Sequence, residues 1–267
     1  MGERVIARVL TIAGSDSGGG AGIEADIKTI SALGGYACTA ITAVTAQNTT
    51  GVYGVHVLPA EFVTLSIATV LGDIGADAIK IGMLGEPEIV EAVAQALPET
   101  IPLVLDPVMI ATSGTQLLSP AALAVLRTRL IPRATLVTPN LPEAAALTGR
   151  APVSMADAEA AGRAILAKGA KAVLVKGGHA AGEMVTDVLV QPERVDYFTH
   201  PRIMGVGGHG TGCTLAAGIA TGLAQGLPLA AAVARARRYL QSALAASPGF
   251  GKGAGPLWHG LAPPADD

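Results

Sequence analysis

The stretch Gly208-His209-Gly210-Thr211-Gly212-Cys213-Thr214 is a glycine-rich loop that runs directly into Leu215–Ile219, a small-residue segment for which we predict a helix. Backbone N–H groups are unpaired at the start of a helix, and the helix dipole adds positive charge there, so the junction suits an anion. Cys213 lies inside the loop, where a helix N-terminus favours the thiolate. This combination indicates phosphoryl or acyl transfer; the alternative is a tight turn with a small buried cysteine.

Outward from this loop, short apolar runs alternate with helical patterns along the chain. We predict strands at residues 5–13, 37–44, 52–58, 78–81, 103–105, 134–137, 172–175, 184–190 and 195–199. We predict helices at residues 22–33, 60–71, 86–97, 119–130, 154–168, 211–224 and 229–245. Such alternation predicts an α/β protein with three layers, in which helices cover both faces of a mostly parallel sheet. Neither an internal repeat nor a Pro/Ser-rich linker interrupts the pattern, so we expect one domain over residues 1–267.

Composition narrows the class of protein. Hydrophobic residues make up 50% of the chain and aromatic residues only 3%, so the core must be built from Ala, Val, Ile and Leu. The net charge of −3 and the absence of a basic run argue against nucleic-acid binding. Two cysteines are too few for a disulfide framework. Glycines and polar residues interrupt the long uncharged stretches, and residues 1–4 do not start a signal peptide, so we expect a cytoplasmic protein without membrane spans.

Polar residues follow the predicted strands at the points where the strands end. They are Gly14-Ser15-Asp16, Gln47-Asn48, Gly82-Met83, Asp106, Asn140 and Lys176-Gly177-Gly178. Ligands of such folds bind beyond the carboxyl ends of the strands, so we expect these residues to share one site.

Three oxygen-bearing side chains suggest a cation site. Asp106, Asn140 and Glu143 suit Mg²⁺, which also binds phosphate and water. The alternative is that Asn140 and Glu143 form a capping box, and both roles can coexist. Lys176 is either a phosphate ligand or a surface lysine. Asp26, one turn into a predicted helix, belongs either to the site or to a solvated helix face.

Seven motifs, in this order, resemble the hydroxymethylpyrimidine/phosphomethylpyrimidine kinases of thiamine biosynthesis, within the ribokinase superfamily, to which pyridoxal kinases are closely related. The matching stretches are AGSDSGGGAGIEAD (13–26), CTAITAVTAQNTTGV (38–52), KIGMLG (80–85), DPVM (106–109), TPNLPEA (138–144), VKGGH (175–179) and HGTGCTLAAGIA (209–220). The resemblance implies a ribokinase-like fold and an enzyme that uses ATP and Mg²⁺. It would phosphorylate 4-amino-5-hydroxymethyl-2-methylpyrimidine and then its monophosphate. A pyridoxal kinase or a dual-activity enzyme is the alternative.

The resemblance also implies roles for individual residues. The pyrimidine pocket would be lined by Gly14, Asp26, Gln47, Met83 and Val108. ATP would meet Lys176, Asn140 and Arg237, and Mg²⁺ would be organised by Asp106 and Glu143, with Asn140 beside them. Gly210, Thr211 and Gly212 would form the anion hole, with Cys213 as the base near the acceptor hydroxyl.

Two positions depart from the family's pattern. Gly207-Gly208 stands where relatives usually carry Asn-Thr, and Arg237 stands where they often carry Lys. A catalytically silent binding protein on the same fold is a further alternative, against which the set Asp106, Glu143, Lys176 and Cys213 argues. We also expect a homodimer, because the predicted strand at residues 52–58 could form a flap or pair with a partner.

Overall fold

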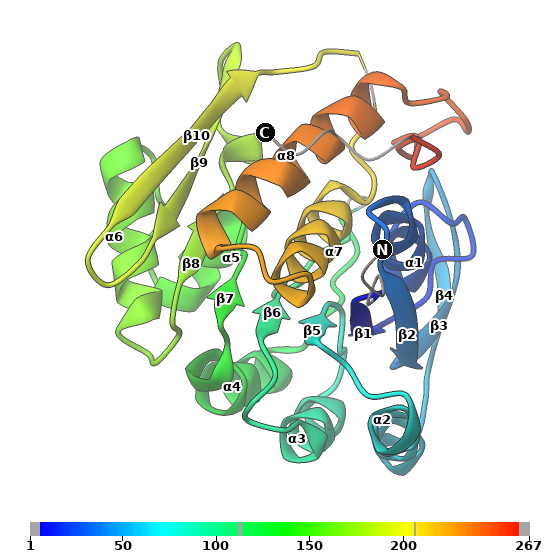
Figure 1. Ribbon diagram of the computed structural model, residues 1–267. Helices are drawn as coiled ribbons and strands as arrows, with labels where there is room; N and C mark the ends of the chain where they lie inside the picture. The colour runs from blue at the N-terminus through cyan, green and yellow to red at the C-terminus, as the bar shows by residue number, and fades with distance from the viewer. Residues whose placement is uncertain (1–5, 112–113, 206, 262–267) are drawn as a thin grey trace, which may run out of the picture.

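The computed structural model describes residues 6–111, 114–205 and 207–261. An eight-stranded sheet forms its centre (Figure 1). The strand order is β10 (Val195–Pro201), β9 (Met184–Val190), β8 (Val173–Val175), β7 (Leu136–Val137), β6 (Leu103–Leu105), β5 (Ala78–Ile81), β1 (Arg8–Ala13) and β2 (Tyr36–Ile41). The pairs from β2 to β8 are parallel, and β9 and β10 add an antiparallel hairpin at one edge. The predicted mostly parallel sheet is therefore confirmed.

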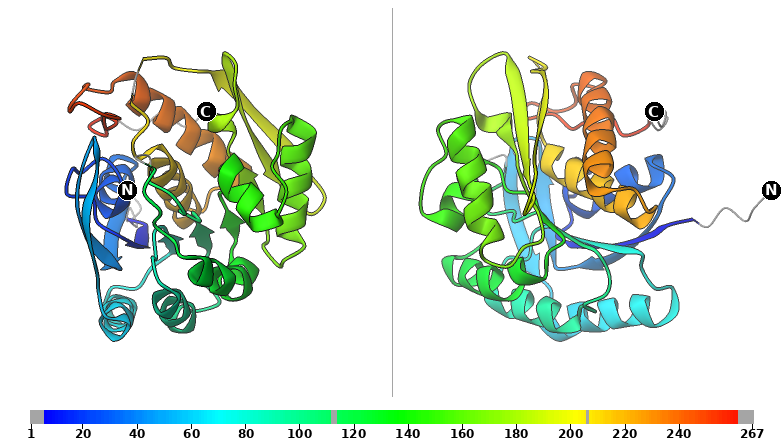
Figure 2. Two further views of the ribbon diagram at one scale, coloured as in Figure 1. Left: turned by 180° about the vertical axis from the view of Figure 1, so that it is seen from behind. Right: turned by 60° about the vertical axis from the view of Figure 1, so that its left-hand side comes forward.

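Helices cover both faces of this sheet, which makes three layers (Figure 2). One layer contains α2 (Ala60–Asp73), α3 (Pro87–Ala96), α4 (Pro120–Arg129), α5 (Leu141–Thr148) and α6 (Met155–Leu166). The other contains α1 (Gly22–Ala32), α7 (Thr211–Ala224) and α8 (Leu229–Ala245). Within β1, Leu10 faces the first layer and Val9 the second, as expected of a strand whose two faces are both buried.

Small residues determine how closely the two last helices pack. A Cβ added to Gly218 would lie 3.0 Å from Ala236 Cβ, and one added to Gly222 would lie 2.8 Å from Ala232 Cβ. The absence of side chains at these two positions lets α7 lie directly against α8. Alanine and glycine at these contacts therefore permit the close packing of the two helices.

Two elements differ from the prediction. The predicted strand at residues 37–44 is divided, because β2 ends at Ile41 and β3 (Ala43–Asn48) leaves the sheet to pair with β4 (Gly51–Val57). Thr42 holds the turn between them, since its N–H donates to Ala13 O and its hydroxyl donates to Met83 O, at 3.0 and 2.7 Å. Helix α5 was not assigned from its apolar pattern, although its first turn carries the expected capping box.

The remaining predicted elements occur with shifts of a few residues at their ends. The first strand was expected from Val5, which lies outside the described residues, as do residues 1–4. Two short 3₁₀ helices, Ile131–Arg133 and Gly177–His179, complete the structure. In the part of the chain that the structure describes, no helix combines the length and the apolar character needed to cross a membrane.

Candidate active site

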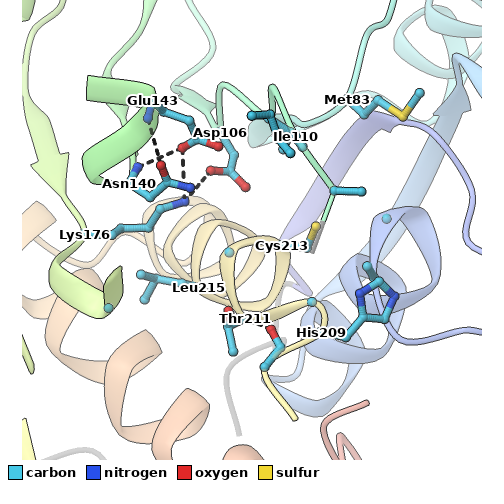
Figure 3. A pocket seen from close by; sticks show the side chains of 18 of the residues that line it. Met83, Asp106, Ile110, Asn140, Glu143, Lys176, His209, Thr211, Cys213 and Leu215 are labelled. Atoms are coloured by element: carbon cyan, nitrogen blue, oxygen red, sulfur yellow. Dashed lines mark hydrogen bonds and ion pairs between the residues drawn. The ribbon is translucent and has the colours of Figure 1, made fainter. Parts of the chain in front are cut away.

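A cavity of about 760 Å³ opens beyond the carboxyl ends of β1, β5, β6, β7 and β8, next to the start of α7. It collects side chains from segments that are far apart in the sequence (Figure 3). The predicted site residues that line it are Gly14, Gln47, Met83, Asp106, Val108, Asn140, Glu143, Lys176, Gly210, Thr211, Gly212, Cys213 and Arg237. These residues therefore line one cavity, whereas Asn48, Gly82 and Gly177, which were also expected to share the site, do not line it.

The glycine-rich loop packs backbone to backbone against the first loop of the chain. Gly210 has a φ of +88°, and a Cβ at this position would collide with the carbonyl oxygen of Gly20. A Cβ added to Gly212 would lie 3.2 Å from Lys176 Nζ and 3.3 Å from Asp106 Oδ2. The start of α7 thus faces a cation and a carboxylate at close range, which is a geometry suited to a bound phosphate.

Of the two glycines that depart from the family's pattern, Gly207 and Gly208, the structure explains the first. A Cβ at Gly207 would collide with the backbone of Gly255, whereas one at Gly208 would meet only Thr211 Cγ2 at 3.9 Å. The Thr211 hydroxyl donates to Gly208 O at 3.0 Å. In this chain, therefore, Gly207 permits contact with the C-terminal segment, and nothing in the structure explains Gly208.

A charged cluster forms the opposite wall of the cavity. Lys176 Nζ lies 2.7 Å from Asp106 Oδ1 and 4.0 Å from Glu143 Oε2, and the Thr138 hydroxyl donates to Asp106 Oδ1 at 3.0 Å. Burial alone would lower the pKa of Lys176, but the two carboxylates raise it, so the lysine stays charged. Burial raises the pKa of Glu143 to about 7. Lys176 is therefore not a surface lysine.

The proposed cation ligands also cap a helix. Asn140 Oδ1 accepts from Glu143 N at 2.8 Å, and Glu143 Oε2 accepts from Asn140 N at 2.7 Å, so the capping box is confirmed. Within the described ranges, no group of three or more His, Cys, Asp and Glu side chains could hold a metal ion. Asp106 and Glu143 nevertheless fit Mg²⁺, which typically takes one or two carboxylates and completes its shell with water and substrate phosphate.

Cys213 lies in the first turn of α7 and lines the cavity. Burial of its thiol raises its pKa to about 11, although the charge of Lys80 acts in the opposite direction. The expected lowering of this pKa is therefore wrong, because desolvation of the buried thiol outweighs the charge of Lys80.

Asp26 is a correction to the predicted pocket. It is fully buried beneath the cavity and not part of its lining, and it does not lie on a solvated face either. Its Oδ2 atom accepts from Lys80 Nζ at 2.7 Å and from the Thr11 hydroxyl at 2.5 Å. Lys80 itself is fully buried, but it does line the cavity. The sequence does indicate such a residue, because Lys80 is a charged residue within an otherwise apolar predicted strand. A buried lysine requires a partner of opposite charge.

Two further residues of the site, Asp16 and His209, received no individual role from the sequence, although Asp16 was among the polar residues expected at the strand ends. His209 Nε2 lies 2.8 Å from Asp16 Oδ2 and 3.1 Å from Gln47 Nε2. Asp16 and His209 are 2% and 8% exposed, so they are nearly removed from water. On the same side of the cavity, a Cβ at Gly14 would lie 3.0 Å from Met83 Sδ, so Gly14 gives the methionine its space.

Arg237 lines the cavity from α8 but is already paired. Its guanidinium forms an ion pair with Asp187, and its Cζ lies 5.8 Å from the centre of the Phe198 ring. Burial lowers the pKa of Arg237 to about 10. Asp187 also accepts from Gly177 N at 2.7 Å, so this pair holds the loop after Lys176.

Known proteins with similar sequences indicate the family of this chain. The family described as phosphomethylpyrimidine kinase matches residues 16–258. The hydroxymethylpyrimidine/phosphomethylpyrimidine kinase of Rhizobium meliloti is 49% identical over 255 residues, which cover 94% of this chain and 96% of that protein. The thiamine biosynthesis bifunctional protein ThiED of Geobacter sulfurreducens is 47% identical over 95% of this chain, which spans only 52% of that protein.

A solved structure confirms the ribokinase-like fold. The pyridoxal kinase from Staphylococcus aureus in complex with AMP-PCP and pyridoxal superposes with a TM-score of 0.88. It is 34% identical, and the match covers 96% of this chain and 94% of that one. Identity is thus higher to the pyrimidine kinase than to the pyridoxal kinase. By its sequence, the chain belongs to the phosphomethylpyrimidine kinase family.

Proposed function

We propose that this protein transfers the γ-phosphoryl group of ATP to 4-amino-5-hydroxymethyl-2-methylpyrimidine, and then phosphorylates the monophosphate to the diphosphate. The observation that carries this proposal is the start of α7, which faces Lys176 and Asp106 across Gly212. The start of a helix, a buried cation and a carboxylate are thereby placed around one position in the cavity, as phosphoryl transfer requires.

The polyphosphate of ATP would be held on the charged side of the cavity. Lys176 and Asn140 would contact the phosphates, and Arg237 would close the nucleotide side from α8. Asp106 and Glu143 would hold Mg²⁺, which neutralises phosphate charge when it is bound. Lys176 Nζ lies 2.7 Å from Asp106 Oδ1 and 4.0 Å from Glu143 Oε2, so the proposed phosphate ligand and the proposed Mg²⁺ ligands belong to one cluster.

The pyrimidine would bind between Gly14, Gln47, Met83 and Val108. The Gln47 amide can donate and accept hydrogen bonds with an aminopyrimidine edge, and the Met83 side chain can adapt to a flat ring. All four line the cavity, and in the view of Figure 3 Cys213 lies between Met83 and Lys176. The acceptor hydroxyl would therefore point toward Cys213.

The transfer would follow from this placement. The hydroxymethyl oxygen forms a bond to the γ-phosphorus while the bond between that phosphorus and the ADP oxygen breaks. The hydroxyl proton passes to the Cys213 thiolate, and the N–H groups of Gly210, Thr211 and Gly212 stabilise the transferring charge. The buried charge of Lys80 favours the thiolate form of Cys213, which lowers its pKa against the effect of burial.

An ATP-consumption assay with the pyrimidine tests whether the protein is an enzyme. We expect turnover that depends on both the pyrimidine and Mg²⁺. Tight pyrimidine binding without ATP hydrolysis would instead favour a catalytically silent binding protein. Pyridoxal kinase activity is the second candidate, because the pyridoxal kinase in complex with AMP-PCP and pyridoxal shares the fold.

We also propose a homodimer in the cytoplasm, where ATP is available. Val44, Tyr53 and Val55 on the β3–β4 hairpin are 46%, 71% and 45% exposed, so this hairpin offers apolar area to a second copy. Sedimentation velocity would detect the dimer, and a Tyr53→Asp variant should shift the protein toward the monomer.

A further inference from the structure

A buried chain of polar groups connects the glycine-rich loop to the predicted pyrimidine pocket. Asp16 accepts N–H groups from Gly18, Gly20 and Ala21 at 2.8, 3.0 and 2.8 Å. Burial alone would raise the pKa of Asp16, but the hydrogen bonds from His209, Ala21 and Gly18 hold it below its ordinary value. Asp16 is therefore an ionised carboxylate, which can only accept hydrogen bonds.

This carboxylate determines which group His209 presents. Nε2 of His209 lies 2.8 Å from Asp16 Oδ2, so this nitrogen must carry a proton and donate it. Gly20 also packs closely against the Cδ2–Nε2 edge of the imidazole, because a Cβ at Gly20 would lie only 2.7 Å from His209 Cδ2. His209 thus offers one N–H group in a fixed direction.

The same nitrogen determines how the Gln47 amide must be turned. Gln47 Nε2 is placed 3.1 Å from His209 Nε2, but two donors cannot bond to each other. A half-turn of the amide brings Gln47 Oε1 to this position, and the His209 N–H is then shared between two acceptors. The amino group of Gln47 is consequently released from His209.

We propose that His209, held by Asp16, is a positioning residue that fixes the Gln47 amide with its amino group toward the substrate ring. Gln47 then selects a ring that presents an acceptor nitrogen at this edge. The identity of the ring rests on the proposed function. The proposal also explains why a histidine stands inside a phosphate-binding loop: it links that loop to recognition of the acceptor substrate.

The amide orientation is tested with Gln47→Glu, compared with Gln47→Leu. Glu keeps an oxygen toward His209 but replaces the amino group with a second oxygen. Calorimetric titration with hydroxymethylpyrimidine should give a Kd about tenfold weaker than wild type for both variants. A Gln47→Glu variant that binds as tightly as wild type would show that Gln47 presents its oxygen to the ring, which overturns the proposal.

The positioning role is tested with a double-mutant cycle. His209→Phe should weaken pyrimidine binding about tenfold in the wild-type background, and less than about twofold when Gln47 is already Leu. His209→Gln retains an N–H donor, so it should restore binding to within about threefold. The KM for ATP should stay within about twofold of the wild-type value in all of these variants. A general collapse of the glycine-rich loop would instead raise the KM for ATP.

Equal weakening by His209→Phe in both backgrounds, or a parallel rise of the KM for ATP, would overturn the positioning role. Turnover by the wild-type protein separates this inference from the proposed function. A wild-type protein that binds the pyrimidine without phosphorylating it contradicts the proposed kinase function. In that case the Kd values of the double-mutant cycle still test the positioning role of His209. A wild type that does not bind the pyrimidine contradicts both.

Discussion

At the residue scale, Cys213 is the side chain on which the proposed chemistry depends most. Positioned general bases contribute about 10²–10⁴-fold, so Cys213→Ala should lower kcat by at least about 100-fold. Cys213→Ser should lose as much, since a hydroxyl is a weaker base than a thiolate. A kcat of Cys213→Ala within about threefold of wild type would reject Cys213 as the base.

The pH dependence of kcat/KM provides a second test of Cys213, because this parameter reports ionisations of the free enzyme. With the pKa of the thiol raised to about 11 by burial, the thiolate fraction increases throughout the neutral and alkaline range. We therefore expect log kcat/KM to rise between about pH 8.5 and pH 10 in the wild type and to stay level in Cys213→Ser, because Glu143, whose pKa is about 7, is already ionised in this range. The same rise in both proteins would assign it to another group.

Lys80 and Asp26 form a fully buried ion pair, which sequence reasoning did not identify. Lys80→Met leaves the Asp26 carboxylate without its partner and should lower the free energy of unfolding by about 3–5 kcal/mol. The double variant Lys80→Met/Asp26→Leu removes both charges and should regain most of this loss. Urea denaturation measures both effects, and a Lys80→Met variant as stable as wild type would show that the pair is not ionised.

His259 makes the stability of the fold depend on pH. Its Nε2 atom lies 2.9 Å from the Thr214 hydroxyl, and burial lowers its pKa to about 4. The unfolded chain, with an ordinary histidine pKa of about 6.5, binds the proton more readily between these values. The stabilisation is therefore present above pH 6.5 and is lost as the pH falls to 4, by up to about 1.4 kcal/mol per pH unit.

The comparison that isolates this effect is His259→Gln, which can still bond to Thr214 but does not titrate. Its free energy of unfolding should fall less steeply than that of the wild type between pH 6.5 and pH 4.5. Identical slopes for the two proteins would show that His259 does not take up the proton on unfolding.

At the scale of the elements, two glycines next to the start of α7, Gly210 and Gly208, allow a test with a matched control. Gly210→Ala places a side chain at a left-handed φ of +88° and against Gly20, so it should displace the loop. Gly208→Ala meets only Thr211 Cγ2 at 3.9 Å and should behave as wild type. We expect kcat to fall about 100-fold for Gly210→Ala and less than about threefold for Gly208→Ala, as measured by steady-state kinetics. Similar activities would contradict the role of this loop geometry.

Most elements could be predicted from the period of their apolar residues, because buried parallel strands and amphipathic helices have distinct patterns. The division of residues 37–44 could not, since both strands are rich in β-branched residues. What separates them is the pair of hydrogen bonds that Thr42 makes to Ala13 and Met83, and these residues are distant in sequence. Helix α5 was missed because it is only eight residues long, too short for a clear period.

At the scale of the whole molecule, the rule that strand ends share one site brought most of the expected polar residues to one cavity, although Asn48, Gly82 and Gly177 do not line it. Asp26, which the resemblance placed in the pocket, does not line it either. The partners of the buried polar groups could not be predicted. Lys80 and Asp26 are separated by 54 residues, and His209 and Asp16 by 193. Such pairs depend on strand order, which no local pattern contains. One domain over the whole chain stays a prediction.

The central claim is that the cavity is built for phosphorylation of a hydroxymethylpyrimidine. The direct measurement is kcat/KM for hydroxymethylpyrimidine and for pyridoxal, with ATP and Mg²⁺, together with chromatographic identification of the products. We expect a clear preference for the pyrimidine and formation of both its monophosphate and its diphosphate. A higher kcat/KM for pyridoxal, or no phosphorylated pyrimidine, would contradict it.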